Sequence, residues 1–122
     1  MKKILVIDDE PYVVKTLARM LKADGYEVIG GYSGKDGLEK AESQKPDLIL
    51  LDILMPKPDG YDVLKKLKAD KNSKTPVIML TARRSTEDIV KTMVDGGAVD
   101  YIIKPFCEEE LLNKIKRALR QE

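Results

Sequence analysis

The sequence predicts an α/β fold: a doubly wound, five-stranded parallel sheet flanked by five helices. Short apolar runs alternate with amphipathic stretches in units of about 20 residues, a pattern that favours βαβ crossovers and parallel strands. The runs are rich in Val, Ile and Leu without polar alternation, as in strands covered by helices on both faces. They are Ile4–Ile7, Tyr26–Ile29, Leu48–Leu51, Val77–Leu80 and Tyr101–Ile103.

Local signals predict where several helices begin and end. Pro11 suits a first helical turn and Gly25 offers a C-terminal stop. The acids Glu108–Glu110 suit the positive N-terminus of the last helix. Two serines are each followed three residues later by an aspartate, as candidate capping pairs: Ser33 with Asp36, and Ser85 with Asp88. Apolar stripes mark the first and last helices: Val13, Val14, Leu17 and Leu21; Leu111, Leu112, Ile115 and Leu119.

The strand order follows from the character of the runs. The second run, read through its glycines as Glu27–Gly31, is the most polar and is broken by Gly30 and Gly31, which suits a sheet edge. The first and third runs are the most uniformly apolar, which suits the centre. The order 2-1-3-4-5 satisfies both observations and places a topological switch point between the first and third strands.

Composition limits the class of protein. The length of 122 residues suits one domain spanning residues 1–122. With 22 basic and 21 acidic residues, the net charge of +1 argues against a nucleic-acid-binding domain. The single cysteine, Cys107, indicates a reducing compartment, so we expect a cytoplasmic protein. The first apolar run stops at Asp8, too early for a signal peptide or a membrane span.

Polar side chains follow four of the five predicted strands. Asp8 and Asp9 follow the first run, Asp52 the third, Thr81 the fourth and Lys104 the fifth. Ligands of open parallel sheets bind beyond the carboxyl ends of the strands, so these groups are expected to converge. Three carboxylates and one lysine leave a formal charge of about −2, which Mg²⁺ would cancel. A metal beside a lysine and a threonine suits phosphoryl transfer.

Each of these residues also has an ordinary interpretation. Asp8 and Asp9 before a proline are, taken alone, more often a helix cap than a metal site. Asp52 alone is an acid at the start of a loop, Thr81 a cap or turn residue, and Lys104 a solvated charge. Their shared position at strand ends favours the functional reading.

The ordered set of motifs resembles a known family, the receiver (CheY-like) domains of two-component response regulators. The resemblance covers essentially the whole chain and implies a flavodoxin-like fold. The residues that carry it are Asp8-Asp9, Asp47–Pro56 with Asp52, Asp59-Gly60, Leu80-Thr81-Ala82, Gly97-Ala98 and Asp100–Phe106.

The resemblance implies specific roles at the phosphoryl and metal sites. Asp52 would accept a phosphoryl group from phosphohistidine on a sensor histidine kinase or a histidine phosphotransfer protein. The Mg²⁺ ligands would be Asp8, Asp9, Asp52 and the backbone carbonyl of Leu54. Such a protein catalyses only its own phosphorylation and dephosphorylation, and is otherwise a signalling switch.

The resemblance also implies how the phosphoryl group is bound and how its binding changes the surface of the protein. Lys104, the Thr81 hydroxyl and the Ala82 amide would contact phosphoryl oxygens, and the Lys104–Pro105 bond is expected to be cis. Tyr101 would move inward with Thr81 and reshape the face built from the fourth helix, fifth strand and fifth helix. This change would control an output partner or a weak homodimer. Variable positions include three residues: Leu54 and Arg83, which border the phosphoryl group, and Val99, which replaces an acid common in DNA-binding members.

Three rival functions fit the sequence less well. A nucleotide-binding enzyme fits poorly, because a phosphate loop at Gly30–Lys35 would need glycine in place of Ile29 and Ser or Thr in place of Asp36. An aspartate-nucleophile phosphohydrolase would want an acid at Leu54. A scaffold with a vestigial site would not need every reactive residue type. Cys107, at the start of the last helix, is either a redox-sensitive thiol or, more simply, a cap-like residue.

Overall fold

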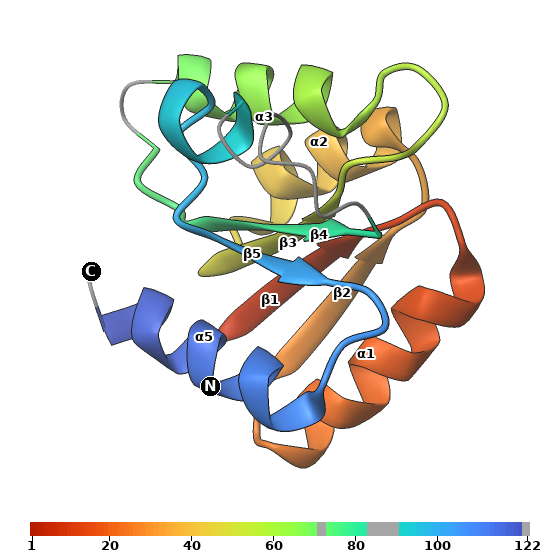
Figure 1. Ribbon diagram of the computed structural model, residues 1–122, viewed down its shortest axis with the longest axis vertical. Helices are drawn as coiled ribbons and strands as arrows, with labels where there is room; N and C mark the ends of the chain where they lie inside the picture. Colours follow the sequence, from red (N-terminus) through yellow and green to blue (C-terminus); the bar gives the residue numbers. More distant parts are fainter. Residues whose placement is uncertain (71–72, 83–90, 121–122) are drawn as a thin grey trace.

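The computed structural model describes residues 1–70, 73–82 and 91–120 (Figure 1). Its centre is a five-stranded parallel sheet in the order β2-β1-β3-β4-β5. The predicted strand order is therefore confirmed. The strands are β1 (Lys3–Ile7), β2 (Glu27–Gly31), β3 (Leu48–Asp52), β4 (Val77–Thr81) and β5 (Asp100–Ile103).

Helices cover both faces of the sheet, as Figure 1 shows. One face carries α1 (Pro11–Ala23) and α5 (Glu108–Arg120), and the other carries α2 (Gly34–Gln44) and α3 (Gly60–Ala69). In the connection from β4 to β5, the described segment Lys91–Asp95 is π-helical and is labelled η1. Its Met93 packs with the α2 and α3 face.

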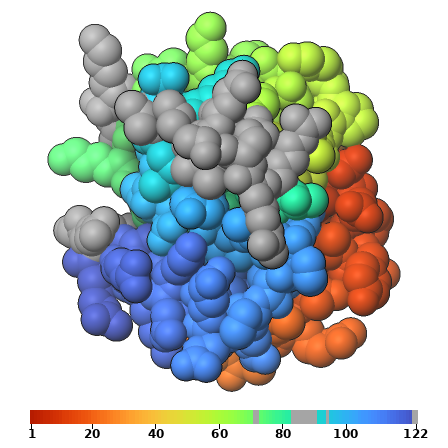
Figure 2. Space-filling model, in the orientation of Figure 1, coloured from red at the N-terminus to blue at the C-terminus, as the bar shows by residue number. Residues whose placement is uncertain are grey.

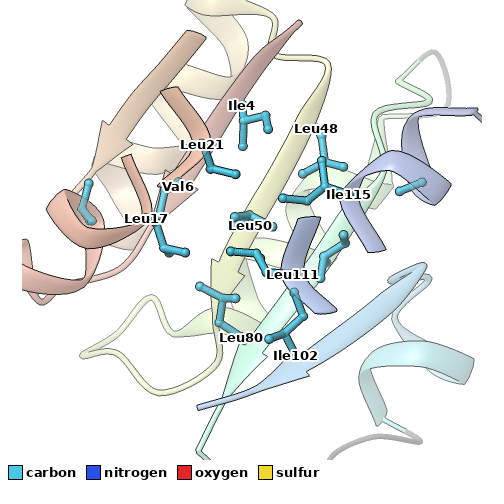
Figure 3. Close-up of a cluster of buried hydrophobic side chains, with 13 residues drawn as sticks. Ile4, Val6, Leu17, Leu21, Leu48, Leu50, Leu80, Ile102, Leu111 and Ile115 are labelled. Atoms are coloured by element: carbon cyan, nitrogen blue, oxygen red, sulfur yellow. The ribbon is translucent and has the colours of Figure 1, made fainter. Parts of the chain in front are cut away.

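Alternate residues of each central strand belong to different cores. On β1, Ile4 and Val6 pack with α1 and α5, whereas Leu5 and Ile7 pack with α2 and α3. All four side chains are fully buried. Figure 3 shows the first core, where Leu17 and Leu21 of α1 and Leu111 and Ile115 of α5 approach the sheet. Burial on both faces explains why these strands lack polar alternation.

The edge strand β2 spans the polar, glycine-broken run Glu27–Gly31, as predicted. Gly30 and Gly31 pair with Val6 and Ile7 of β1, so the strand ends two residues beyond Ile29. Ladder pairing uses backbone groups, which glycine supplies as well as valine does.

Helix capping agrees with the prediction at one of the two candidate pairs. The Asp36 amide donates to the Ser33 hydroxyl oxygen at 3.0 Å, which caps α2. The pair Ser85 and Asp88 lies outside the described residues. A full capping box forms instead at α3, where Asp59 and Asp62 each accept from the other's backbone amide at 3.0 Å.

Candidate functional site

The carboxyl ends of four strands bring the predicted reactive residues together. Asp52 is the last residue of β3 and Thr81 the last of β4, while Asp8 and Lys104 directly follow β1 and β5. The register explains their convergence, because Ile7 pairs with Leu51 and Leu80 pairs with Asp52 across adjacent strands. The expected rim of polar groups is therefore present in the fold.

Lys104 is the direct link between the two buried carboxylates. Its Nζ lies 2.9 Å from Oδ2 of Asp8 and 3.3 Å from Oδ1 of Asp52. Asp8 is fully buried and Asp52 is 4 % exposed. The Lys104 amide also donates to the Thr81 carbonyl at 2.7 Å, which ties this lysine to the end of β4. Asp8, Asp52, Thr81 and Lys104 thus form one compact polar cluster.

Asp8 is held in this cluster by local backbone contacts rather than acting as a helix cap. Its Oδ1 accepts from the Glu10 amide at 3.0 Å, and its own amide donates to the Gly31 carbonyl at 3.0 Å. The N-cap residue of α1 is Glu10, and no side-chain hydrogen bond caps that helix. The ordinary reading of Asp8 as a helix cap is therefore wrong.

Burial and a neighbouring negative charge change the pKa of Asp52, the candidate phosphoryl acceptor. Burial, followed by the negative charge of Asp8, raises the pKa of Asp52 from 3.8 to about 6, although Lys104 opposes the rise. Burial alone would lower the pKa of Lys104, but hydrogen bonds and charge from Asp8 and Asp52 together outweigh it and raise that pKa. Lys104 therefore stays protonated, and one cation incompletely balances two buried carboxylates.

The residues present fit a divalent cation. One carboxylate oxygen from each of Asp8, Asp9 and Glu10 lies within 4.8 Å of the others. Of these acids, Asp8 shares Lys104 with Asp52, and its negative charge is the second cause, after burial, of the raised pKa of Asp52. Hard carboxylate oxygens are the donors that Mg²⁺ prefers. Glu10 was not predicted, although its position directly after Asp8 and Asp9 was a readable signal.

The other predicted residues occupy the surroundings of this cluster. The Leu54 amide donates to Asp52 Oδ1 at 3.4 Å, while the Leu54 side chain is 46 % exposed. Thr81 is 1 % exposed and Ala82 is exposed beside it. Arg83 lies outside the described residues. Tyr101 is partly buried against the α2 and α3 core.

The loop after Asp52 is held closely against β3. A Cβ on Gly60 would lie 2.3 Å from the Asp52 carbonyl oxygen, so only glycine fits there without movement. The Gly60 amide donates to the Ile53 carbonyl at 3.0 Å. Lys57 pairs with both capping acids, at 3.1 Å to Asp59 and 3.2 Å to Asp62. These contacts fix the loop that carries Leu54.

Two proline bonds and one cysteine complete the neighbourhood. The Lys104–Pro105 bond is cis, as expected, and the Lys57–Pro58 bond is also cis, which was not predicted. Cys107 is exposed just before α5, and its carbonyl accepts from the Leu111 amide at 3.0 Å. This backbone contact, which any residue can make, places Cys107 at the helix start, and both interpretations of its thiol stay predictions.

Comparison with known proteins decides the family. The family model described as "Response regulator receiver domain" matches residues 4–116. The chain belongs to this family. Family membership makes it a signalling domain of the two-component type rather than a conventional enzyme.

Curated relatives and solved structures agree with this assignment. The receiver domain is 44 % identical over 120 residues to the alkaline phosphatase synthesis transcriptional regulatory protein PhoP of Bacillus subtilis, covering 98 % of this chain and 49 % of PhoP. It is 42 % identical to the response regulator ArlR of Staphylococcus saprophyticus, covering all of this chain and 54 % of ArlR. The chain therefore spans about half the length of these relatives.

The fold comparison gives the same result. The Vibrio cholerae chemotaxis protein CheY4 superimposes with a TM-score of 0.90 at 32 % identity, covering 97 % of this chain and 98 % of CheY4. The beryllofluoride-activated receiver domain of Klebsiella pneumoniae RstA gives 0.91 at 30 % identity, covering 98 % and 99 %. Among the described helices of this receiver domain, none is long and apolar enough to cross a membrane.

Proposed function

We propose that Asp52 of this receiver domain accepts a phosphoryl group from phosphohistidine on a sensor histidine kinase or a histidine phosphotransfer protein. The observation that carries the proposal is the cluster in which Lys104 lies within 3.3 Å of Asp52 Oδ1 and 2.9 Å of Asp8 Oδ2. A fixed cation beside a carboxylate nucleophile is the arrangement that phosphoryl transfer requires.

Each residue has a distinct task in this proposal. Ionised Asp52 attacks phosphorus, the phosphorus–nitrogen bond of phosphohistidine breaks, and the imidazole leaves with the electron pair. A pKa of about 6 leaves Asp52 ionised at neutral pH. Lys104 would then shift its ion pair from the Asp52 carboxylate to a phosphoryl oxygen. The Thr81 hydroxyl and the Ala82 amide would donate to the remaining oxygens. The methyl side chain of Ala82 leaves room for the incoming group.

The metal site is part of the same proposal. Asp8, Asp9, Asp52 and the carbonyl of Leu54 would hold Mg²⁺, with Glu10 close enough to bind through a retained water. When bound, Mg²⁺ would neutralise the charge of the carboxylates and of the phosphoryl group. The Leu54 amide keeps Asp52 Oδ1 oriented, at 3.4 Å, while the second oxygen is available to react.

The signalling output would pass through Tyr101. The Lys114 ammonium lies 4.8 Å from the Tyr101 ring centroid, donates to the Tyr101 carbonyl at 2.7 Å and pairs with Asp100 at 3.3 Å. Lys114 of α5 therefore holds β5 in place. If the phosphoryl group captures the Thr81 hydroxyl, Tyr101 would move into the vacated space and these contacts would change.

The resulting surface would bind the output partner. In Figure 2 the chain from η1 to α5, cyan to dark blue, forms much of the visible face. Several of its charges are already paired within the chain, as Lys114 with Asp100, and Val99 is 39 % exposed. A homodimer through exposed ion pairs, each worth about 0–1 kcal/mol, would be weak and sensitive to salt. Both the dimer and a cytoplasmic location belong to the proposal.

Phosphorylation can be tested directly. The protein is incubated with Mg²⁺ and acetyl phosphate, and its intact mass is followed. We expect one phosphoryl adduct on the parent protein, none on Asp52→Asn and an unchanged yield on Asp95→Asn, an exposed matched control. An undiminished adduct on Asp52→Asn would refute the assignment of the acceptor.

The switch is tested separately. NMR spectra with and without beryllofluoride should show changes in Asp100, Tyr101 and Lys114 as well as around Asp52. Changes confined to the Asp52 pocket would refute the Tyr101 mechanism. Sedimentation of the same samples distinguishes the outputs: phosphorylation-dependent dimerisation indicates a homodimer, and a monomer at every concentration indicates a different partner.

A further inference from the structure

Lys68 occupies an unusual place at the opposite end of the sheet from Asp52. It lies near the C-terminal end of α3, and its Nζ donates to the Thr75 carbonyl at 3.2 Å, just before β4 begins. The aliphatic stem passes over Gly97, where an added Cβ would lie 3.6–3.8 Å from the stem carbons. The side chain therefore extends across the surface, with its stem over Gly97 and its amine on the Thr75 carbonyl.

The Lys68 side chain separates two hollows in the surface. A hollow of about 550 Å³ is lined by Pro46, Asp47, Lys74 and Thr75. A second, of about 580 Å³, lies between α3 and η1 and includes Lys65, Lys91 and Asp95. Nζ is hydrogen-bonded to the carbonyl of Thr75, which lines the first hollow, so we assign the amine to that hollow.

The electrostatic setting of Lys68 is the reverse of that of Lys104. Within the part of the chain that the structure describes, no carboxylate lies within ion-pair distance of the Lys68 ammonium. The carboxylate of the nearby Asp47 accepts instead from the Lys3 amide at 2.7 Å. Burial without a carboxylate partner lowers the pKa of Lys68. A larger share of this amine is therefore neutral and nucleophilic at neutral pH.

We propose that Lys68 is an acylation site for small acyl phosphates, which enter the hollow lined by Lys74 and Thr75. The neutral Nζ attacks the acyl carbon, and the bond from that carbon to the phosphate oxygen breaks. Inorganic phosphate leaves with the electron pair, and the nitrogen loses a proton to water to give an amide. Lys74 provides a positive charge in the same hollow that complements the phosphate of the donor, while the Asp47 carboxylate, which also lines it, accepts from the Lys3 amide.

This reaction is independent of phosphoryl transfer to Asp52. An acyl phosphate has two electrophilic centres, carbon and phosphorus. Lys68 lies at the amino end of the strands and attacks the acyl carbon. The proposed acceptor Asp52 lies at the carboxyl end and attacks phosphorus. Failure of one reaction therefore leaves the other untouched, and Asp52→Asn should not change acylation of Lys68.

The test compares lysines within one molecule. The folded protein is incubated briefly with acetyl phosphate at pH 7.5 without Mg²⁺, and acetylated peptides are quantified by mass spectrometry. Lys66, exposed on the same helix, is the internal control. We expect Lys68 to be acetylated several-fold faster than Lys66, and to lose this advantage in urea-unfolded protein. A Lys68 rate no higher than that of Lys66 would overturn the proposal.

Two variants identify the hollow that the donor uses. Lys74→Gln should lower the ratio of Lys68 to Lys66 acetylation, whereas Lys65→Gln, in the hollow between α3 and η1, should leave it unchanged. An unchanged ratio in Lys74→Gln, or a loss confined to Lys65→Gln, would refute the assigned route. Neither residue belongs to the phosphoryl site.

Discussion

Replacing Asp52 with Asn should stabilise the metal-free protein at neutral pH. The carboxylate is buried, with its side chain 5 % exposed, and it lies beside Asp8, whose negative charge also opposes its ionisation. Its pKa rises from 3.8 to about 6 in the folded protein. At about 1.36 kcal/mol per pKa unit, ionised Asp52 costs at most about 3 kcal/mol of folding free energy.

The sign of this effect sets its pH dependence. Below pH 3.8 the carboxyl is protonated in both the folded and the unfolded state, and this ionisation cost is absent. Between pH 3.8 and about 6 the folded state retains a proton that the unfolded state loses, so stability falls as pH rises. Above about pH 6 the full cost is present. Asn carries no charge and avoids it, although it also loses the ion pair with Lys104.

Urea unfolding in EDTA measures the prediction. Asp52→Asn should exceed the parent protein in free energy of unfolding by about 1–3 kcal/mol at pH 7.5, and by much less at pH 4. Asp95→Asn, at an exposed site, should show no such pH-dependent gain. A variant that is less stable than the parent at pH 7.5, or a difference independent of pH, would refute the electrostatic reasoning.

Three further perturbations probe the same cluster. Mg²⁺ at ten times its dissociation constant should add about 1.4 kcal/mol of stability, and a thermal shift that persists undiminished in Asp8→Asn would contradict the metal site. Lys104→Met should raise the Asp52 pKa further, because Lys104 lowers it; an NMR titration showing no rise would contradict the pairing. Gly60→Ala should cost about 1–3 kcal/mol and slow phosphorylation, since its Cβ would meet the Asp52 carbonyl. Gly25→Ala is the control. An added Cβ at that position would meet nothing within 4 Å, so any change in stability should leave phosphorylation unchanged.

The sequence predicted the sheet well, because strands buried on both faces impose a strong pattern. Ile4 to Ile7 are fully buried, and alternate residues serve different cores. At Gly30 and Gly31 the apolar pattern stops while backbone pairing continues, and these glycines instead marked the run as an edge strand. The Asp59–Asp62 capping box also went unpredicted, because it lacks the Ser or Thr followed by Glu or Gln that marks such a box in a sequence.

The sequence predicted which residues form the site better than it predicted the contacts between those residues. The positions of Asp8, Asp52 and Lys104 at strand ends followed from the topology. The ion pair between Asp8 and Lys104 joins residues 96 positions apart, so no local pattern could give its distance. Lys68 was not singled out, because its properties depend on the burial of its stem and on the position of the Thr75 carbonyl.

The central claim, that Asp52 is the phosphoryl acceptor, is tested most directly by trapping the acyl phosphate. Borohydride reduces an aspartyl phosphate to homoserine and leaves unmodified aspartate unchanged. After incubation with acetyl phosphate and Mg²⁺, tandem mass spectrometry should find homoserine at position 52. Homoserine at Asp8 or Asp9 instead, or at none of the three positions despite a phosphoryl adduct in the intact mass, would contradict the account.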